Sequence, residues 1–225
     1  MSEESLENKV SENAVDGVEN SNSAEVIPEP APISNLIKSI LAFLAIALML
    51  RGTFLEAFKI PSGSMLETLQ EGDYLVVNKL SYNFWLPWLR KSAFNFAEPK
   101  RGDVVVFTLP DDPSTEDKNE ADINIIKRII AVGGDTVEVK GTKVYLNDVL
   151  QSESYAMYLQ GGARDFPKYT IPEKSVFLLG DNRDNSRDAR FWDVHHLEID
   201  RIKGRALFIY FNMGFDFSRF FKAIK

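Results

Sequence analysis

Short apolar stretches separated by turn signals fill most of the chain after residue 52. Most are rich in Val, Ile and Leu, and several alternate apolar with polar side chains, which is typical of β-strands. Gly-Asp and Gly-Gly pairs lie between them, as expected of turns. The pattern predicts a mainly β domain of antiparallel strands over residues 52–225, with few helices. The expected strands are 74–80, 103–109, 123–132, 136–140, 143–148, 175–180 and 205–211.

One apolar segment, residues 33–51, differs from the strands in its length and its lack of alternation. Every residue from Ile40 to Leu50 is apolar, and Lys38 and Arg51 flank that run. A cleavable signal peptide is disfavoured because a long acidic stretch precedes the segment, and a buried core helix because no polar face interrupts it. We expect a transmembrane anchor, although it is shorter than the roughly 20 apolar residues of a usual span. Its flanking charges do not decide its orientation.

The first 32 residues contain eight acidic side chains and one basic one, and they end in three prolines. This composition is too polar to form a core, so residues 1–32 are expected to be a disordered acidic tail. The whole chain has a formal charge of -7, all of which lies in this tail. The remaining residues are formally neutral and show no basic excess, so nucleic-acid binding is not expected.

The content of cysteine and histidine narrows the chemistry further. The chain has no cysteine, which excludes a disulfide framework, a thiolate zinc site and a cysteine nucleophile. Its only histidines, His195 and His196, are adjacent and lack the spacing of metal ligands on one helical face. We therefore predict neither a metal nor an organic cofactor.

A candidate nucleophile lies in the sequence Pro61-Ser62-Gly63-Ser64-Met65. Pro61 and Gly63 favour a tight turn, which would present Ser64 to a substrate. The same composition is common in ordinary loops, so this motif alone is weak. A serine hydroxyl also needs a base within hydrogen-bonding distance to become a nucleophile.

Two bases are available in principle. His195 could act with Asp188 or Asp193 in a Ser/His/Asp triad. Lys127 lies in the apolar segment 124–130, where it would be a base if burial lowered its pKa from the usual value of about 10.4 toward neutrality. In an ordinary strand Lys127 would instead extend to solvent. The residues by themselves leave both bases open.

A third cluster, residues 180–190, is dense in Asp, Asn, Arg and Ser side chains, which commonly fix loops by hydrogen bonding to the backbone. A calcium loop is disfavoured because the sixth position lacks glycine and the twelfth is Trp192 instead of glutamate. An ordinary solvated charged loop is the remaining alternative. The cluster indicates a functional site only in combination with the other two motifs.

Taken in order, these three motifs resemble those of bacterial type I signal peptidases, or leader peptidases: the serine motif at 61–65, the lysine motif at 101–107 with 125–135, and the supporting motif at 180–192. The resemblance covers the apolar segment and nearly all of residues 52–225. It implies an antiparallel β-sheet catalytic domain behind an N-terminal transmembrane helix, and a serine/lysine dyad without cofactors.

The resemblance also implies a role for individual side chains. Ser64 would be the nucleophile and Lys127 the general base, with the Ser62 hydroxyl and the Ser64 N–H as the oxyanion hole. Supporting roles would fall to Ser186, which orients the lysine, and to an Asp188–Arg190 pair that holds the loop. The residues implied to line shallow apolar pockets for small substrate side chains are Phe58, Ile60, Met65 and Ile126.

Substrate and location follow from the same resemblance. The expected activity is cleavage of signal peptides from exported preproteins after Ala-x-Ala-type sites. The expected partners are these preproteins and the lipid bilayer. The enzyme would be a single-pass protein of the bacterial inner membrane, with its tail in the cytoplasm and its catalytic domain outside. Residues 84–91 fit an interfacial patch, and a buried strand is the alternative.

Two positions depart from the usual family pattern. Glu67 stands where the nucleophile motif usually has proline, and Asp193 where glycine usually follows Phe-Trp. Both lie outside the dyad, so they bear on substrate preference more than on chemistry. A non-catalytic, membrane-tethered paralogue and a self-cleaving repressor-type protease are the alternative functions. The second would need a DNA-binding domain, which the acidic tail does not supply. The oligomeric state is left open.

Overall fold

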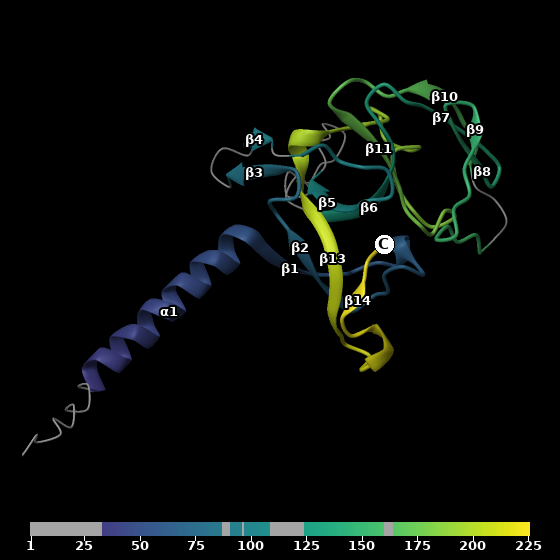
Figure 1. Cartoon of the computed structure of the whole chain (residues 1–225). Helices are drawn as coiled ribbons and strands as arrows, with labels where there is room; N and C mark the ends of the chain where they lie inside the picture. The colour runs from purple at the N-terminus through teal and green to yellow at the C-terminus, as the bar shows by residue number, and fades with distance from the viewer. Residues whose placement is uncertain (1–32, 87–90, 96, 109–123, 160–163) are drawn as a thin grey trace, which may run out of the picture. The chain divides into compact units, whose positions relative to one another are not determined.

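The computed structural model describes residues 33–86, 91–95, 97–108, 124–159 and 164–225 (Figure 1). The predicted acidic tail and part of the predicted interfacial segment lie outside these residues. The chain divides into two compact units, residues 1–43 and 44–225. The second unit contains all of the strands in the described residues.

The segment predicted as an anchor forms the helix α1 (Ile33–Phe54). Its side chains between Ile33 and Ile46 are exposed, including large apolar ones such as Leu41 and Phe43. No helix within the described ranges is long and apolar enough to cross a membrane. The predicted helix is therefore confirmed, whereas a membrane crossing is not shown.

An antiparallel sheet of eight strands forms the centre of the second unit, in the order β1-β2-β13-β5-β6-β11-β12, with β14 paired to β13. The predicted mainly β, antiparallel fold is confirmed. The strands are β1 (Leu55–Lys59), β2 (Asp73–Asn78), β5 (Val104–Thr108), β6 (Asn124–Val132), β11 (Ser175–Leu179), β12 (Leu197–Glu198), β13 (Ile202–Asn212) and β14 (Lys222–Ala223).

Two smaller sheets accompany it. A four-stranded sheet has the order β10-β7-β8-β9, and a hairpin pairs β3 with β4. Figure 1 shows the four-stranded sheet as a separate green layer beyond β11. The bounds are β3 (Asn83–Leu86), β4 (Lys91–Asn95), β7 (Thr136–Lys140), β8 (Lys143–Leu146), β9 (Val149–Leu150) and β10 (Phe166–Thr170). The strands β1, β3, β4, β9, β10, β12 and β14 were not among the expected strands. The shortest of them, β9, β12 and β14, have two residues each, too few to show an alternation.

The strand β5 explains why the central strands read as continuous apolar runs. Its alternate side chains enter two different hydrophobic clusters: Val104 and Val106 pack into one, Val105 and Phe107 into another. Successive side chains of a strand point to opposite faces, so β5 is covered on both. A strand in that position, like the neighbouring β6, buries whatever side chain it carries. This holds even for a basic one.

Candidate active site

The turn that carries Ser64 leaves the sheet at the end of β1. Ile60 still pairs with the start of β2, since its N–H donates to Asp73 O at 2.8 Å. The 3-10 turn η1 (Gly63–Met65) begins three residues later. Met65 is fully buried and Ser64 is half-buried, so the core holds the turn by its last residue. The serine side chain stays accessible at the edge.

Lys127 comes from the middle of β6 and meets this turn. Its Nζ lies 2.7 Å from Ser64 Oγ and 3.0 Å from Ile126 O, and the residue is only 4% exposed. Sixty-three positions separate the two residues in the chain. The fold therefore brings a hydroxyl and a buried amine to hydrogen-bonding distance, the arrangement that a nucleophile and its base require.

Burial is also the main electrostatic influence on Lys127. It lowers the pKa of the amine from 10.5 to about 8, and the carboxylates of Asp188 and Asp181 oppose part of this decrease. A charged amine loses its hydration when buried, so the neutral form is favoured. Near neutral pH an appreciable fraction of Lys127 can therefore accept a proton.

The loop after β11, residues 180–190, lies against the turn that carries Ser64 and binds its backbone. Asn182 donates from its backbone N–H to Ser64 O at 3.2 Å, and from its side chain to Gly63 O at 3.0 Å. The loop begins at Gly180, where a Cβ would overlap Ser186 Oγ and lie 2.5 Å from Ser64 O. Glycine is required there because the two segments touch at the backbone.

Ser186 is buried beside Gly180, but its Oγ has no hydrogen-bond partner among the described residues. A hydrogen bond from Ser186 to Lys127 was implied by the family resemblance. The geometry shows Ser186 close to the turn, without that hydrogen bond.

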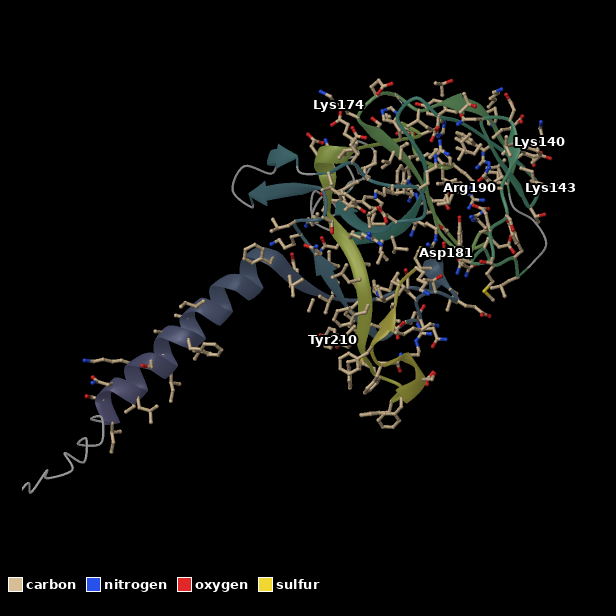
Figure 2. The ribbon with its side chains drawn as sticks, in the orientation of Figure 1. Lys140, Lys143, Lys174, Asp181, Arg190 and Tyr210 are labelled. Carbon is tan, nitrogen blue, oxygen red and sulfur yellow. The ribbon has the colours of Figure 1, made fainter. Side chains whose placement is uncertain are left out.

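Asp188 and Arg190 form a two-pronged ion pair, with Nε to Oδ1 at 2.8 Å and Nη2 to Oδ2 at 2.9 Å. Asp188 also accepts from Gly180 N–H at 3.0 Å, and Arg190 donates to Arg183 O at 2.8 Å. These contacts tie both ends of the loop together, the arrangement expected if the pair supports the site. Figure 2 shows Arg190 and Asp181 among the side chains between the sheets.

A second buried ion pair was not predicted. Arg128, the neighbour of Lys127, binds Asp181 through two hydrogen bonds of 2.8 Å, and Thr68 donates to the same carboxylate at 2.6 Å. The ring of Tyr155 lies 4.0 Å from the guanidinium carbon. The adjacent basic residues 127 and 128 in an apolar strand were the available signal, since a buried strand must place one cation on each face.

The four residues implied to form the substrate pockets lie together. Ile60, Met65 and Ile126 belong to one buried cluster, and Phe58 packs against it. Ser62 is exposed and precedes η1 in an extended conformation, without a side-chain capping hydrogen bond. An apolar wall thus adjoins the serine on the side of β1 and β6.

The structure argues against the histidine alternative. His195 Nδ1 lies 2.8 Å from Ala189 O, and its ring contacts Phe166 and Tyr169. Asp188, its possible partner in a triad, is bound to Arg190. Within the described ranges, no group of three or more His, Cys, Asp or Glu side chains could hold a metal ion.

Comparison with known proteins gives a family. A family model described as signal peptidase, peptidase S26, matches residues 33–211, most of the chain. This chain belongs to that family. The predicted resemblance is thereby confirmed, and with it the prediction of a signal peptidase hydrolase.

Several curated relatives are similar over most of this chain. Signal peptidase I of Pseudomonas aeruginosa is 36% identical over 202 residues, which cover 74% of this chain and 68% of the relative. The chain spans 64% of signal peptidase I of Pseudomonas fluorescens. Probable signal peptidase I-1 of Synechocystis is 37% identical, covering 82% of this chain and 87% of the relative. A crystal structure of a signal peptidase I from Enterococcus faecalis V583 aligns with 25% identity and a TM-score of 0.38, over 49% of this chain and 98% of that one.

Proposed function

We propose that this protein is a membrane-bound serine endopeptidase that removes N-terminal signal peptides from exported preproteins after Ala-x-Ala-type sites. Ser64 is the nucleophile and Lys127 the general base. The observation that carries the proposal is the 2.7 Å separation of Ser64 Oγ and a buried Lys127 Nζ whose pKa is lowered to about 8.

The reaction follows from this geometry. Neutral Lys127 takes the hydroxyl proton as Ser64 Oγ attacks the scissile carbonyl, and the negative charge develops on the carbonyl oxygen. The Ser64 N–H and the Ser62 hydroxyl stabilise that oxygen, each contributing about 3 to 4 kcal/mol by analogy with other acyl-transfer sites. Protonated Lys127 then gives its proton to the departing amine. Water, deprotonated by the same lysine, releases the signal peptide from the serine.

We propose separate roles for the residues around the dyad. The Asp188–Arg190 pair fixes the loop 180–190, which packs against the turn that carries Ser64 (residues 61–65, the nucleophile turn). Ser186 on that loop orients the lysine amine when substrate is bound. Apolar pockets formed by Phe58, Ile60, Met65 and Ile126 accept small side chains and reject large ones by overlap. The substrate backbone supplies hydrogen bonds as an added strand.

Two exposed apolar regions support a location at a lipid bilayer. One is α1, whose exposed side chains include Ile37, Leu41 and Phe43. The other is the C-terminal turn with Phe215, Phe217 and Phe221, which an ion pair between Arg219 and buried Asp73 holds in place. We propose that α1 anchors the protein as a single pass in the bacterial inner membrane, with the peptidase domain outside the cytoplasm.

The decisive experiment uses the full chain in detergent and a preprotein with an Ala-x-Ala site. Wild type, Ser64→Ala and Lys127→Ala are compared, and the N-terminus of the product is determined by mass spectrometry. We expect wild type to cut after the last alanine and both folded variants to be inactive. Retention of the preprotein without cleavage by wild type would instead indicate a binding protein.

A separate experiment tests the bilayer contact. The fluorescence of a tryptophan placed at Phe217 should be quenched by brominated lipid in reconstituted vesicles. The measured quantity is the quenching in this variant beyond that of wild type. Tryptophan placed at Val149 is the control and should not be quenched. Val149 is also exposed, but it lies on β9 of the four-stranded sheet. Equal quenching at both positions would contradict a specific lipid-facing turn.

A further inference from the structure

The side chain of Asn182 joins the loop 180–190 to the nucleophile turn. The residue is 1% exposed, and its Nδ2 donates to Gly63 O at 3.0 Å. Its Oδ1 accepts the N–H of Asn185 at 3.3 Å. The donor end of the amide thus faces a carbonyl and its acceptor end faces an N–H, so the side chain has one orientation that satisfies both groups.

The hydrogen bond from Asn182 to Gly63 O also orients the next N–H in the chain, that of Ser64. The Gly63–Ser64 peptide is trans, and a planar trans peptide directs its C=O and its N–H to opposite sides. Fixing the carbonyl of Gly63 toward the buried loop therefore fixes the Ser64 N–H away from it. Rotation of this one peptide would move both groups together.

The turn by itself holds this peptide only weakly. Gly63 O also accepts the N–H of Leu66, at 3.2 Å, which closes the single turn of η1. One short turn leaves its first N–H groups without partners inside the turn. The Asn182 side chain supplies a second donor to the same carbonyl, from a loop that the Asp188–Arg190 pair keeps rigid.

We propose that Asn182 is a positioning residue for the oxyanion hole, which aims the Ser64 N–H at the oxygen of the scissile carbonyl. This inference rests on the proposed function, because it assigns a task to a donor of that site. The described hydrogen bonds of Asn182 go to Gly63, Ser64 and Asn185, so it acts through the peptide plane before the nucleophile. It therefore affects the stabilisation of the oxyanion and leaves proton transfer unchanged.

The backbone of Asn182 makes this role separable from folding of the loop. Its N–H binds Ser64 O and its carbonyl accepts from Asn185, and neither contact depends on the side chain. An Asn182→Ala variant therefore loses the contact with Gly63 while the loop keeps its backbone contacts. Asn182→Asp keeps the shape and the acceptor but has no donor for Gly63 O. Asn185→Ala removes an exposed amide from the same loop and is the matched control.

The experiment measures cleavage by the full-length variants and their inhibition by a peptide aldehyde with the Ala-x-Ala sequence. Ser64 Oγ adds to the aldehyde carbon, Lys127 takes the proton, and charge develops on the former carbonyl oxygen, as in the reaction. Removing an oxyanion donor outright lowers kcat roughly 100-fold or more. A donor that is present but misdirected should lower it by about tenfold.

We expect Asn182→Ala and Asn182→Asp to lower kcat and aldehyde affinity by similar factors, with KM and affinity for the product peptide unchanged. The pH profile of Asn182→Ala should match wild type, because Lys127 keeps its surroundings. Asn185→Ala should match wild type throughout. The inference is wrong if Asn182→Ala keeps wild-type kcat, or if it loses aldehyde and product affinity equally. Failure of wild type to cleave at all would instead reject the proposed function.

Discussion

Lys127 and Arg128 are neighbours on β6, and 4% or less of each is exposed, but their side chains enter different surroundings. Lys127 meets a hydroxyl and a carbonyl oxygen, and no carboxylate forms an ion pair with it in the described part of the chain. Arg128 meets the carboxylate of Asp181 through two hydrogen bonds and also donates to Gly102 O.

The difference allows one strand to carry the proposed base and a structural cation side by side. A buried cation with a partner carboxylate stays charged and holds segments together. A buried amine without one is destabilised in its charged form and becomes able to accept a proton. Residue type matters as well, because arginine does not lose its proton under ordinary conditions whereas a buried lysine can.

The largest expected effect is on activity, from Lys127→Met. The variant keeps an apolar stem of similar length, so we expect cleavage to fall by at least about 10⁴-fold, as when other catalytic bases are removed. Thermal stability should be unchanged or higher, because the variant no longer buries an amine that forms no ion pair. Lys143→Met, on an exposed position of β8, is the control and should change neither. Loss of stability without loss of activity would contradict the role of Lys127 as the base and make it a structural residue instead.

Replacing Arg128 by Met should have the opposite pattern. It leaves the carboxylate of Asp181 buried without its partner, and we expect a loss of about 3 to 5 kcal/mol in the free energy of unfolding. Denaturant unfolding measures this. The double variant Arg128→Met with Asp181→Leu should recover much of the loss, since no charge then remains unpaired. Lys168→Met breaks an exposed ion pair with Asp148 and should cost less than about 1 kcal/mol.

The variant Gly180→Ala tests geometry on the Lys127 side without changing any charge. The added methyl group would overlap Ser186 and crowd Ser64 O. A displacement of about 1 Å at a reacting group can cost roughly 100-fold in rate, which is the decrease in kcat that we expect. In Gly102→Ala the methyl meets open space, and its cost comes only from the positive φ of 88°. That control should lower stability and keep kcat.

The pH dependence should give the smallest effect, about tenfold per pH unit. In the proposed mechanism neutral Lys127 is the reactive form, so kcat/KM should rise with pH up to about 8 and level off above it. A profile that is already flat below pH 7 would contradict the assignment.

Stability should follow the same pKa with a defined sign. The amine binds its proton more weakly in the folded protein, at about 8, than in the unfolded chain, at about 10.5. Between those values the unfolded chain holds more protons, so stability should rise with pH through this window. The difference between wild type and Lys127→Met in denaturant unfolding isolates this contribution from that of other groups.

Much of the fold could be read from local pattern. The central strands β5, β6 and β11 were predicted close to their observed bounds, because β-branched runs between glycine turns are a strong local signal. The short edge strands β12 and β14 were not, since their two residues form strands only through pairing with neighbours. The bilayer patch predicted at residues 84–91 lies in a region whose side chains the structure does not describe. The exposed aromatic turn at residues 215–221 was not anticipated.

The site divides in the same way. The sequence by itself determined the residue types, the order of the three motifs and the family, because motif order is a property of the chain. Only the tertiary structure decided that Lys127 lies within hydrogen-bonding distance of Ser64, that Arg128 binds Asp181, and that Asn182 binds Gly63 in the turn that carries Ser64. Those contacts join residues 53 to 119 positions apart. Burial and the direction of each side chain depend on the packing of both faces of β6, which no local sequence pattern specifies.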